Sequence, residues 1–175
     1  MLAQVGVDSQ CLSYVIDAMA SKFRPTQAVE SQQLALIRLF FYLPETFWVT
    51  PTVMAECAMI RNVELAELHK SFINIQCEEF PLKDPQIVRL RASFLQKHHS
   101  GINDCLILAE AEDAGHNVLL TFDSDFINHL SPHANGVTLV RPVDYWGSLA
   151  IPRGVRPNKV PHPTNPLSSQ NWWHW

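Results

Sequence analysis

Acidic residues are missing from the end of this 175-residue chain, because all 17 aspartates and glutamates lie before residue 151. Residues 1–150 carry 10 − 17 = −7, the last 25 residues carry +3, and the formal net charge is −4. No overall basic surface therefore indicates a nucleic-acid partner. A protein with a net negative charge can still act on a polyanion if bound cations neutralise its acidic site.

Cysteines and long apolar runs are also scarce. The four cysteines include no pair with metal-finger spacing, and a chain of this size needs no disulfide framework. The longest apolar stretch, residues 34–43, is interrupted by Arg38 and is too short to span a bilayer. The N-terminus lacks the basic and apolar pattern of a signal peptide. We therefore expect a cytoplasmic protein with reduced cysteines and no membrane partner.

What is present is the alternating pattern of short buried strands and amphipathic helices. Strands are predicted at residues 3–8, 47–49, 117–121 and 137–140. Helices are predicted at residues 10–22, 26–42, 51–60, 62–75, 84–97, 103–114 and 126–130. Thr50-Pro51 and Asp84-Pro85 give the polar cap and following proline of a helix start, and Gly115 gives a helix end.

This alternation predicts an α/β fold in which helices cover both faces of a central parallel sheet, a three-layer α/β/α sandwich. We assign residues 1–147 to this domain. Residues 148–175 differ in kind, with many prolines, three tryptophans and only basic charges, and we expect a flexible tail that does not join the core.

Four acidic residues occupy positions that converge in such a fold. Asp8 ends the first strand, and Asp123 lies just beyond the strand at 117–121. Asp104 is in the first turn of its helix, and Glu56 is in the second turn of the helix that Thr50 caps. Because ligands bind beyond the carboxyl ends of parallel strands, these side chains are predicted to share one rim.

Converging carboxylates repel one another unless a cation lies between them. Two unit charges about 4 Å apart repel by roughly 4 kcal/mol at an effective dielectric of ~20. Hard divalent ions relieve this repulsion, and ligation by oxygen alone favours Mg²⁺ or Mn²⁺ over zinc. Taken singly, each acid has an ordinary alternative, as a helix cap, a partner of the helix dipole or a solvated residue.

The same residues lie in motifs that resemble the PIN-domain nucleases, above all the compact VapC-like toxin ribonucleases. Four motifs match in chain order over about residues 3–146: Val7-Asp8-Ser9, Thr50-Pro51-Thr52-Val53-Met54-Ala55-Glu56, Asn103-Asp104-Cys105-Leu106-Ile107-Leu108-Ala109 and Leu120-Thr121-Phe122-Asp123-Ser124-Asp125-Phe126. Gln10 stands where many members have asparagine, and the Pro- and Trp-rich tail is not part of the usual domain.

The resemblance implies metal-dependent hydrolysis of RNA, with the family's catalytic acids at Asp8, Glu56, Asp104 and Asp123. Metal ligation would fall to Asp8, Asp104 and Asp123, with Asp125 as a further ligand or neighbour. Thr121 and Ser9 would support them. It also implies an RNA substrate, a homodimer, and an antitoxin protein as partner if the chain is a toxin.

Two other functions compete with this one. A PIN-like scaffold could bind RNA or protein without catalysis, although the presence of all four acids argues against a degenerate site. A response-regulator-like receiver also gathers acids at strand ends, but here Val140-Arg141-Pro142 stands where that fold needs a lysine. His98 and His99 could contact phosphate, and we interpret them instead as a solvated helix end.

Overall fold

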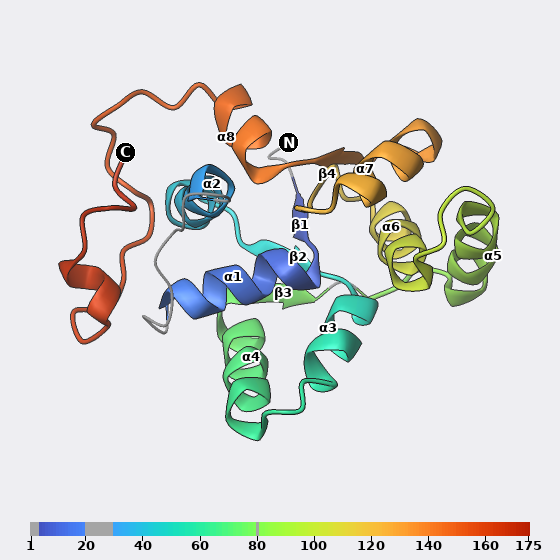
Figure 1. Ribbon diagram of the computed structural model, residues 1–175, viewed down its shortest axis with the longest axis horizontal. Helices are drawn as coiled ribbons and strands as arrows, with labels where there is room; N and C mark the ends of the chain where they lie inside the picture. The colour runs from blue at the N-terminus through green and yellow to red at the C-terminus, as the bar shows by residue number, and fades with distance from the viewer. Residues whose placement is uncertain (1–3, 20–29, 80) are drawn as a thin grey trace.

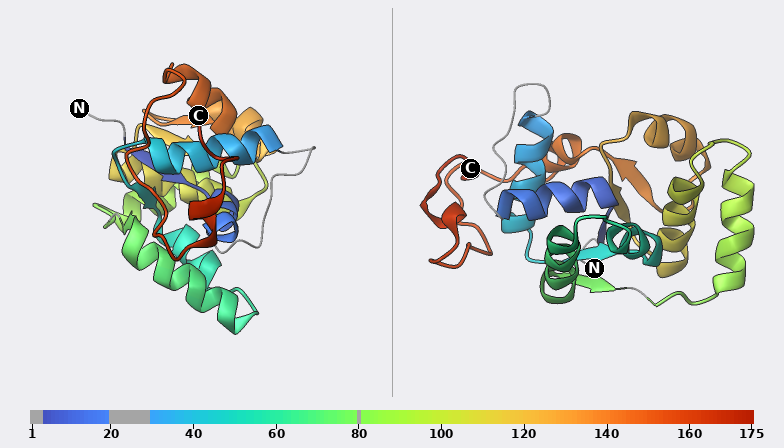
Figure 2. Two further views of the ribbon diagram at one scale, coloured as in Figure 1. Left: turned by 90° about the vertical axis from the view of Figure 1, so that its left-hand side faces the viewer. Right: turned by 60° about the horizontal axis from the view of Figure 1, so that its bottom comes forward.

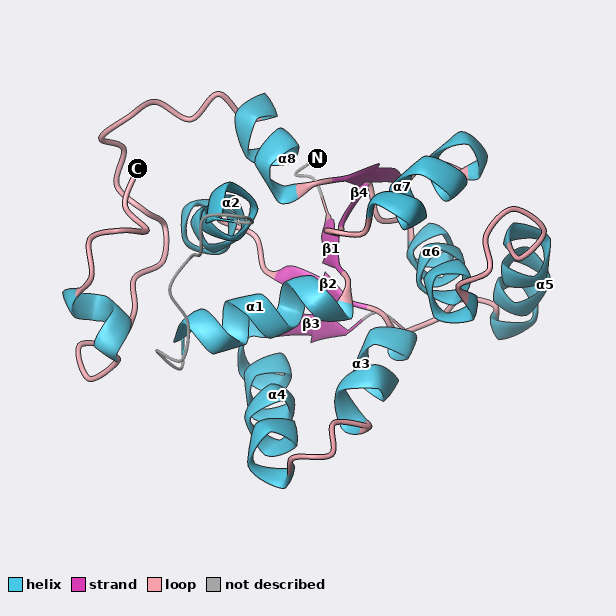
Figure 3. Cartoon of the chain, in the orientation of Figure 1, coloured by secondary structure: helices cyan, strands magenta, loops and turns pink. Residues whose placement is uncertain are grey.

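The computed structural model describes residues 4–19, 30–79 and 81–175 (Figure 1). Five parallel strands form one sheet in the order β3-β2-β1-β4-β5. The strands are β1 (Val5–Val7), β2 (Phe47–Val49), β3 (Cys77–Glu79), β4 (Val118–Leu120) and β5 (Thr138–Val140). Eight described α-helices flank this sheet, which confirms the predicted three-layer α/β/α sandwich (Figure 3).

The helices connect successive strands or extend the layers. They are α1 (Ser9–Met19), α2 (Glu30–Tyr42), α3 (Pro51–Ala58), α4 (Val63–Gln76), α5 (Pro85–Leu95), α6 (Ile102–Ala114), α7 (Ser124–Leu130) and α8 (Pro142–Ser148). Two 3₁₀ turns, η1 (Ser131–His133) and η2 (Pro166–Ser169), complete the described elements. No helix of the described ranges is both long enough and apolar enough to cross a membrane.

Local sequence signals place several helix ends as predicted. The Thr50 side chain accepts a hydrogen bond from the amide of Val53, and Asp84 caps α5 through the amides of Gln86 and Ile87. Gly115 has the left-handed φ of 87° that ends α6. The part of the predicted helix at residues 26–29 lies outside the described residues.

Besides the two 3₁₀ turns, the sequence prediction missed one strand and one α-helix. β3 is an edge strand whose two glutamates are exposed, so it lacks the apolar pattern of a buried strand. It follows α4 directly, without a turn signal between them. α8 begins at Pro142, directly after β5, so this proline starts a helix in its first turn, where proline is tolerated, instead of ending the regular structure.

The tail also differs from its prediction. Leu167 and Trp173 are each 2% exposed and belong to the main hydrophobic core, which corrects the expectation that residues 148–175 stay apart from it. The Trp173 ring lies 4.4 Å from the Phe41 ring of α2. The tail runs along the outer side of α1 and α2, at the end of the molecule opposite α5 (Figures 1 and 2). The physical reason is that the apolar surface of α2 gives the tryptophan a place to be buried.

Candidate carboxylate site

All five strands point the same way, so their carboxyl ends meet at one edge of the sheet. Asp8 follows β1 at this edge and the loop at Thr121 follows β4. α6 runs back from this edge, because its last residue precedes the start of β4, and Asp104 therefore lies near the same edge. α3 begins directly after β2 and carries Glu56.

Asp8 is a buried carboxylate, with only 7% of the residue exposed. Its Oδ1 accepts a hydrogen bond of 2.6 Å from the amide of Cys11 in the first turn of α1. Burial raises the pKa of Asp8, while hydrogen bonds from Thr121 and Cys11 lower it and the charge of Asp104 raises it further. Asp8 is thus both a helix-capping residue and a member of an acidic group.

Asp104 occupies the centre of the group. Its Oδ2 accepts a hydrogen bond of 2.7 Å from Nε2 of His99. Burial raises the pKa of Asp104, the contact with His99 lowers it, and the charges of Asp123 and Glu56 raise it. Asp104 is therefore electrostatically linked to the three other predicted acids.

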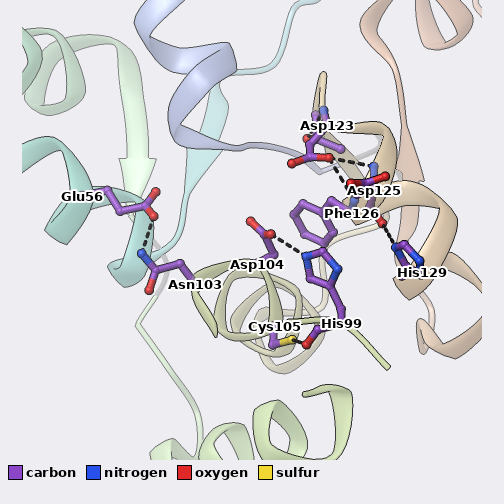
Figure 4. A network of polar contacts seen from close by, with 10 residues as sticks. Glu56, His99, Asn103, Asp104, Cys105, Asp123, Asp125, Phe126 and His129 are labelled. Atoms are coloured by element: carbon purple, nitrogen blue, oxygen red, sulfur yellow. Dashed lines mark hydrogen bonds and ion pairs between the residues drawn. The ribbon is translucent and has the colours of Figure 1, made fainter. Parts of the chain in front are cut away.

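Glu56 reaches the group from α3. Its Oε1 accepts a hydrogen bond of 2.5 Å from the side-chain amide of Asn103, which comes just before Asp104 in the chain. Its Oε2 is buried and has no hydrogen-bond partner among the described residues. Figure 4 shows the carboxylates of Glu56, Asp104 and Asp123 turned toward a shared space.

Asp123 and Asp125 lie at the start of α7. The amides of Asp125 and Phe126 donate to Oδ1 of Asp123 at 2.7 and 3.1 Å, so Asp123 caps α7 through one oxygen. The amide of Asp123 in turn donates to the hydroxyl of Thr121, which is fully buried. Asp125 is exposed and lines a small pocket together with His99 and His129, so it lies at the border of the group.

Open space adjoins the group on both sides. A cleft of about 410 Å³ beside Glu56 is lined in part by Ser9, Gln10 and Tyr14. A smaller pocket of about 150 Å³ is lined by His98, His99, Ser100, Asp125 and His129. The predicted supporting residue Ser9 thus lies in the cleft beside the acids.

Sequence reasoning missed the role of His99. The His99 side chain is 9% exposed, which corrects its interpretation as part of a solvated helix end, whereas His98 is exposed. A signal was present in Gly101, because a Cβ there would come within 2.2 Å of Asp104 Oδ2 and 2.6 Å of His99 Nε2. Only the tertiary structure shows that the loop at Gly101 brings His99 into contact with Asp104.

The two cysteines that follow Glu56 and Asp104 in the chain are core residues. Cys57 is 5% exposed and Cys105 is fully buried. Burial, with the nearby charges of Glu56 and Asp104, raises the pKa of each thiol to about 11. Both are therefore thiols rather than thiolates at neutral pH.

Within the described ranges, no three His, Cys, Asp or Glu side chains are already arranged closely enough to hold a metal ion. The acids share a rim and influence one another's charge, but each is held by protein donors. No protein-family model matches the chain, and no curated protein is significantly similar to it.

Proposed function

We propose that this protein is a Mg²⁺- or Mn²⁺-dependent endoribonuclease that hydrolyses RNA phosphodiester bonds at the carboxylate site. The observation that carries the proposal is geometric: Asp8, Glu56, Asp104 and Asp123 come from four separate segments near the carboxyl edge of the sheet, and the carboxylates of Glu56, Asp104 and Asp123 face one shared space (Figure 4). Like charges gathered at one place repel one another, which costs the fold free energy. A divalent cation would compensate them.

The chemistry of the side chains present fits such an ion. The donors are carboxylate oxygens, which suit hard cations, and Glu56 Oε2 is a buried acceptor without a partner. Asp8, Asp104 and Asp123 would hold the ion, with Asp125 near enough in sequence to assist. When bound, the ion would lower the pKa of water and stabilise charge on the leaving oxygen.

The chain's own residues would then perform defined tasks. Glu56, oriented by Asn103 at 2.5 Å, accepts the proton of the attacking water through its unpaired oxygen. The water oxygen bonds to phosphorus, the bond from phosphorus to O3′ breaks, and O3′ takes a proton from solvent. The products carry 5′-phosphate and 3′-hydroxyl ends, and no protein nucleophile is required. Thr121 supports Asp8 and Asp123 by hydrogen bonds.

The test is Mn²⁺-dependent cleavage of a mixed RNA pool by wild type, Asp8→Asn and Asp104→Asn. Each variant should lose at least about 100-fold in rate, more than the ~10–100-fold typical of residues that only support a ligand. Asp144→Asn is the matched control, because Asp144 is exposed on α8. Full cleavage by Asp104→Asn, free of contaminating nuclease, would reject the assignment.

A non-catalytic scaffold that binds RNA or protein is the competing function. The observation that favours it is that Asp104 and Glu56 already have protein donors, His99 and Asn103. Calorimetric titration with Mn²⁺ separates the two, because a scaffold has no need to bind the ion.

The proposed partners follow from the proposed activity. RNA is the substrate, and an antitoxin protein would restrain the enzyme if it is a toxin. Ile87, Leu90 and Phe94 are exposed on α5 at helical spacing, and this apolar stripe supports the proposed homodimer. Sedimentation of the purified chain measures the oligomeric state directly.

A further inference from the structure

His99 lies next to the most central acid of the site, yet nothing in the proposed reaction uses it. Its Nε2–H donates to Asp104 Oδ2 at 2.7 Å. The contact engages one carboxylate oxygen and leaves Oδ1 outside it, on a side chain that faces the space shared with Glu56 and Asp123 (Figure 4). A hydrogen bond of this kind fixes the direction of a carboxylate that binds a ligand.

The imidazole is held independently of Asp104. Its ring stacks nearly parallel on Phe126, at 14° with 6.3 Å between centroids, and on His129 at 26° and 5.7 Å. The amide of His99 donates to the Leu95 carbonyl at 3.2 Å, and its carbonyl accepts from the Cys105 thiol. A ring that packs against two other rings, on a backbone held at both its amide and its carbonyl, is a fixed partner of Asp104 rather than a mobile counter-ion.

The loop between α5 and α6 is built around this contact. Gly101 has an ordinary φ of −71°, so backbone conformation does not require glycine there. Space does, because a Cβ would lie 2.6 Å from His99 Nε2 and 2.2 Å from Asp104 Oδ2. Both contact atoms would have to move to admit a methyl group.

We infer that His99 is a positioning residue that holds Asp104 in the orientation required to bind a divalent cation. The inference rests on the proposed function for the identity of the ligand. His99 itself contacts neither the ion nor the substrate. It acts only through the Asp104 carboxylate, because its packed ring keeps the Nε2–H donor in place.

Two substitutions separate the donor from the ring. His99→Phe keeps an aromatic ring beside Phe126 and His129 but has no N–H. His99→Gln loses the ring but can present an amide N–H to Asp104. The affinity for Mn²⁺, measured by calorimetry, should fall about 10–100-fold in His99→Phe and should be partly restored in His99→Gln.

Thermal stability of the metal-free protein should follow the opposite order, because stacking contributes to the fold and the Gln side chain does not stack. His99→Phe should therefore be the more stable variant and the weaker Mn²⁺ binder. Gly101→Ala should weaken Mn²⁺ binding with both His99 and Asp104 intact. His98→Ala is the control, since His98 is the exposed neighbour and stacks on His133 instead.

The outcomes distinguish this inference from the nuclease proposal. If wild type cleaves RNA and His99→Phe binds Mn²⁺ as tightly, or more tightly, only the positioning role is overturned. If the Mn²⁺ affinities of the variants merely follow their thermal stabilities, the positioning role is overturned as well. If wild type binds Mn²⁺ without cleaving RNA while His99→Phe loses affinity, the inference stands and the nuclease proposal fails. If wild type binds no Mn²⁺, both fail.

Discussion

The charge of Asp123, in the loop after β4, raises the pKa of Asp104 in the first turn of α6. The two side chains are therefore close enough to repel, although they belong to different elements. Each also has a local partner, since Asp123 caps α7 and Asp104 pairs with His99. This double use makes it possible to separate structural roles from the proposed chemistry by substitution.

Substitutions of Asp123 should separate its capping role from its proposed catalytic role. Asp123→Asn keeps an oxygen that can accept from the amides of α7, so the melting temperature should stay close to wild type while cleavage is lost. Asp123→Ala also removes the cap, at a cost of about 1 kcal/mol or roughly 2–4 °C in a protein of this size. Thermal melts beside cleavage assays check both variants, and equal melting temperatures for the two would contradict the capping role.

Glu110 provides a contrast among the acids. It is 5% exposed and accepts hydrogen bonds from the amide and the hydroxyl of Thr52, at 3.0 and 2.8 Å. Glu110→Ala leaves these donors without a partner and should lower the free energy of unfolding by about 2 kcal/mol.

The Mn²⁺ affinity of Glu110→Ala should remain that of wild type, whereas Glu56→Ala should lose cleavage with little loss of stability. Chemical denaturation and calorimetry measure the two properties separately. A Glu110→Ala protein that is stable but unable to bind Mn²⁺ would place Glu110 in the site.

The raised pKa of Asp8 predicts an unusual dependence of stability on pH. The folded, metal-free protein holds this proton more tightly than the unfolded chain, whose aspartates titrate near ~3.9. As pH rises through the folded pKa, the proton is lost and the free energy of unfolding falls. Asp8→Asn should therefore melt at a higher temperature than wild type at pH 7 without metal, and the difference should vanish below about pH 4.

Adding Mn²⁺ should make wild type melt at a higher temperature than Asp8→Asn. The ion compensates the charge of Asp8 in wild type, whereas Asp8→Asn offers the ion one carboxylate fewer. Melting curves with and without Mn²⁺ measure the reversal. A variant that melts below wild type at neutral pH without metal would show that the Asp8 charge is well compensated by the protein alone.

His116 predicts a loss of stability in acid. Burial lowers its pKa from 6.5 to about 4, and the ring packs 5.7 Å from that of Trp48. The His116 imidazole therefore binds a proton more readily in the unfolded chain than in the folded protein. The free energy of unfolding decreases as pH falls from 6.5 toward 4. The loss should be on the order of 2 kcal/mol once solvent screening is allowed for, and His116→Phe should reduce it. Denaturant midpoints across this pH range check the prediction against wild type.

The burial of Trp173 in the core predicts that the tail contributes to the stability of the fold. Its ring packs on Phe41, its Nε1–H donates to the Leu167 carbonyl at 3.1 Å, and Arg38 donates to the Trp173 carbonyl. Trp173→Ala should cost about 3–5 kcal/mol, the range for large aromatic residues removed from a core. Removal of the half-buried Trp172 by the matched Trp172→Ala change should cost less. Equal unfolding midpoints for wild type and Trp173→Ala would contradict the docked tail.

The sequence alone determined the fold class and the chain order of the strands and α-helices other than β3 and α8. Thr50-Pro51, Asp84-Pro85 and Gly115 fix helix ends through bonds that span a few residues, so their effect does not depend on the rest of the chain. The parallel sheet followed from the alternation of strands and helices. Its carboxyl edge then indicated which acids would share a rim.

Only the tertiary structure decided what lies around those acids. His99 meets Asp104 because the loop at Gly101 turns tightly, and Asn103 meets Glu56 because α3 and α6 pack together. Trp173 is buried because α2 offers Phe41, a partner more than a hundred residues earlier in the chain. Such contacts depend on how whole helices pack, and the local composition that predicted a separate tail contains no information about them.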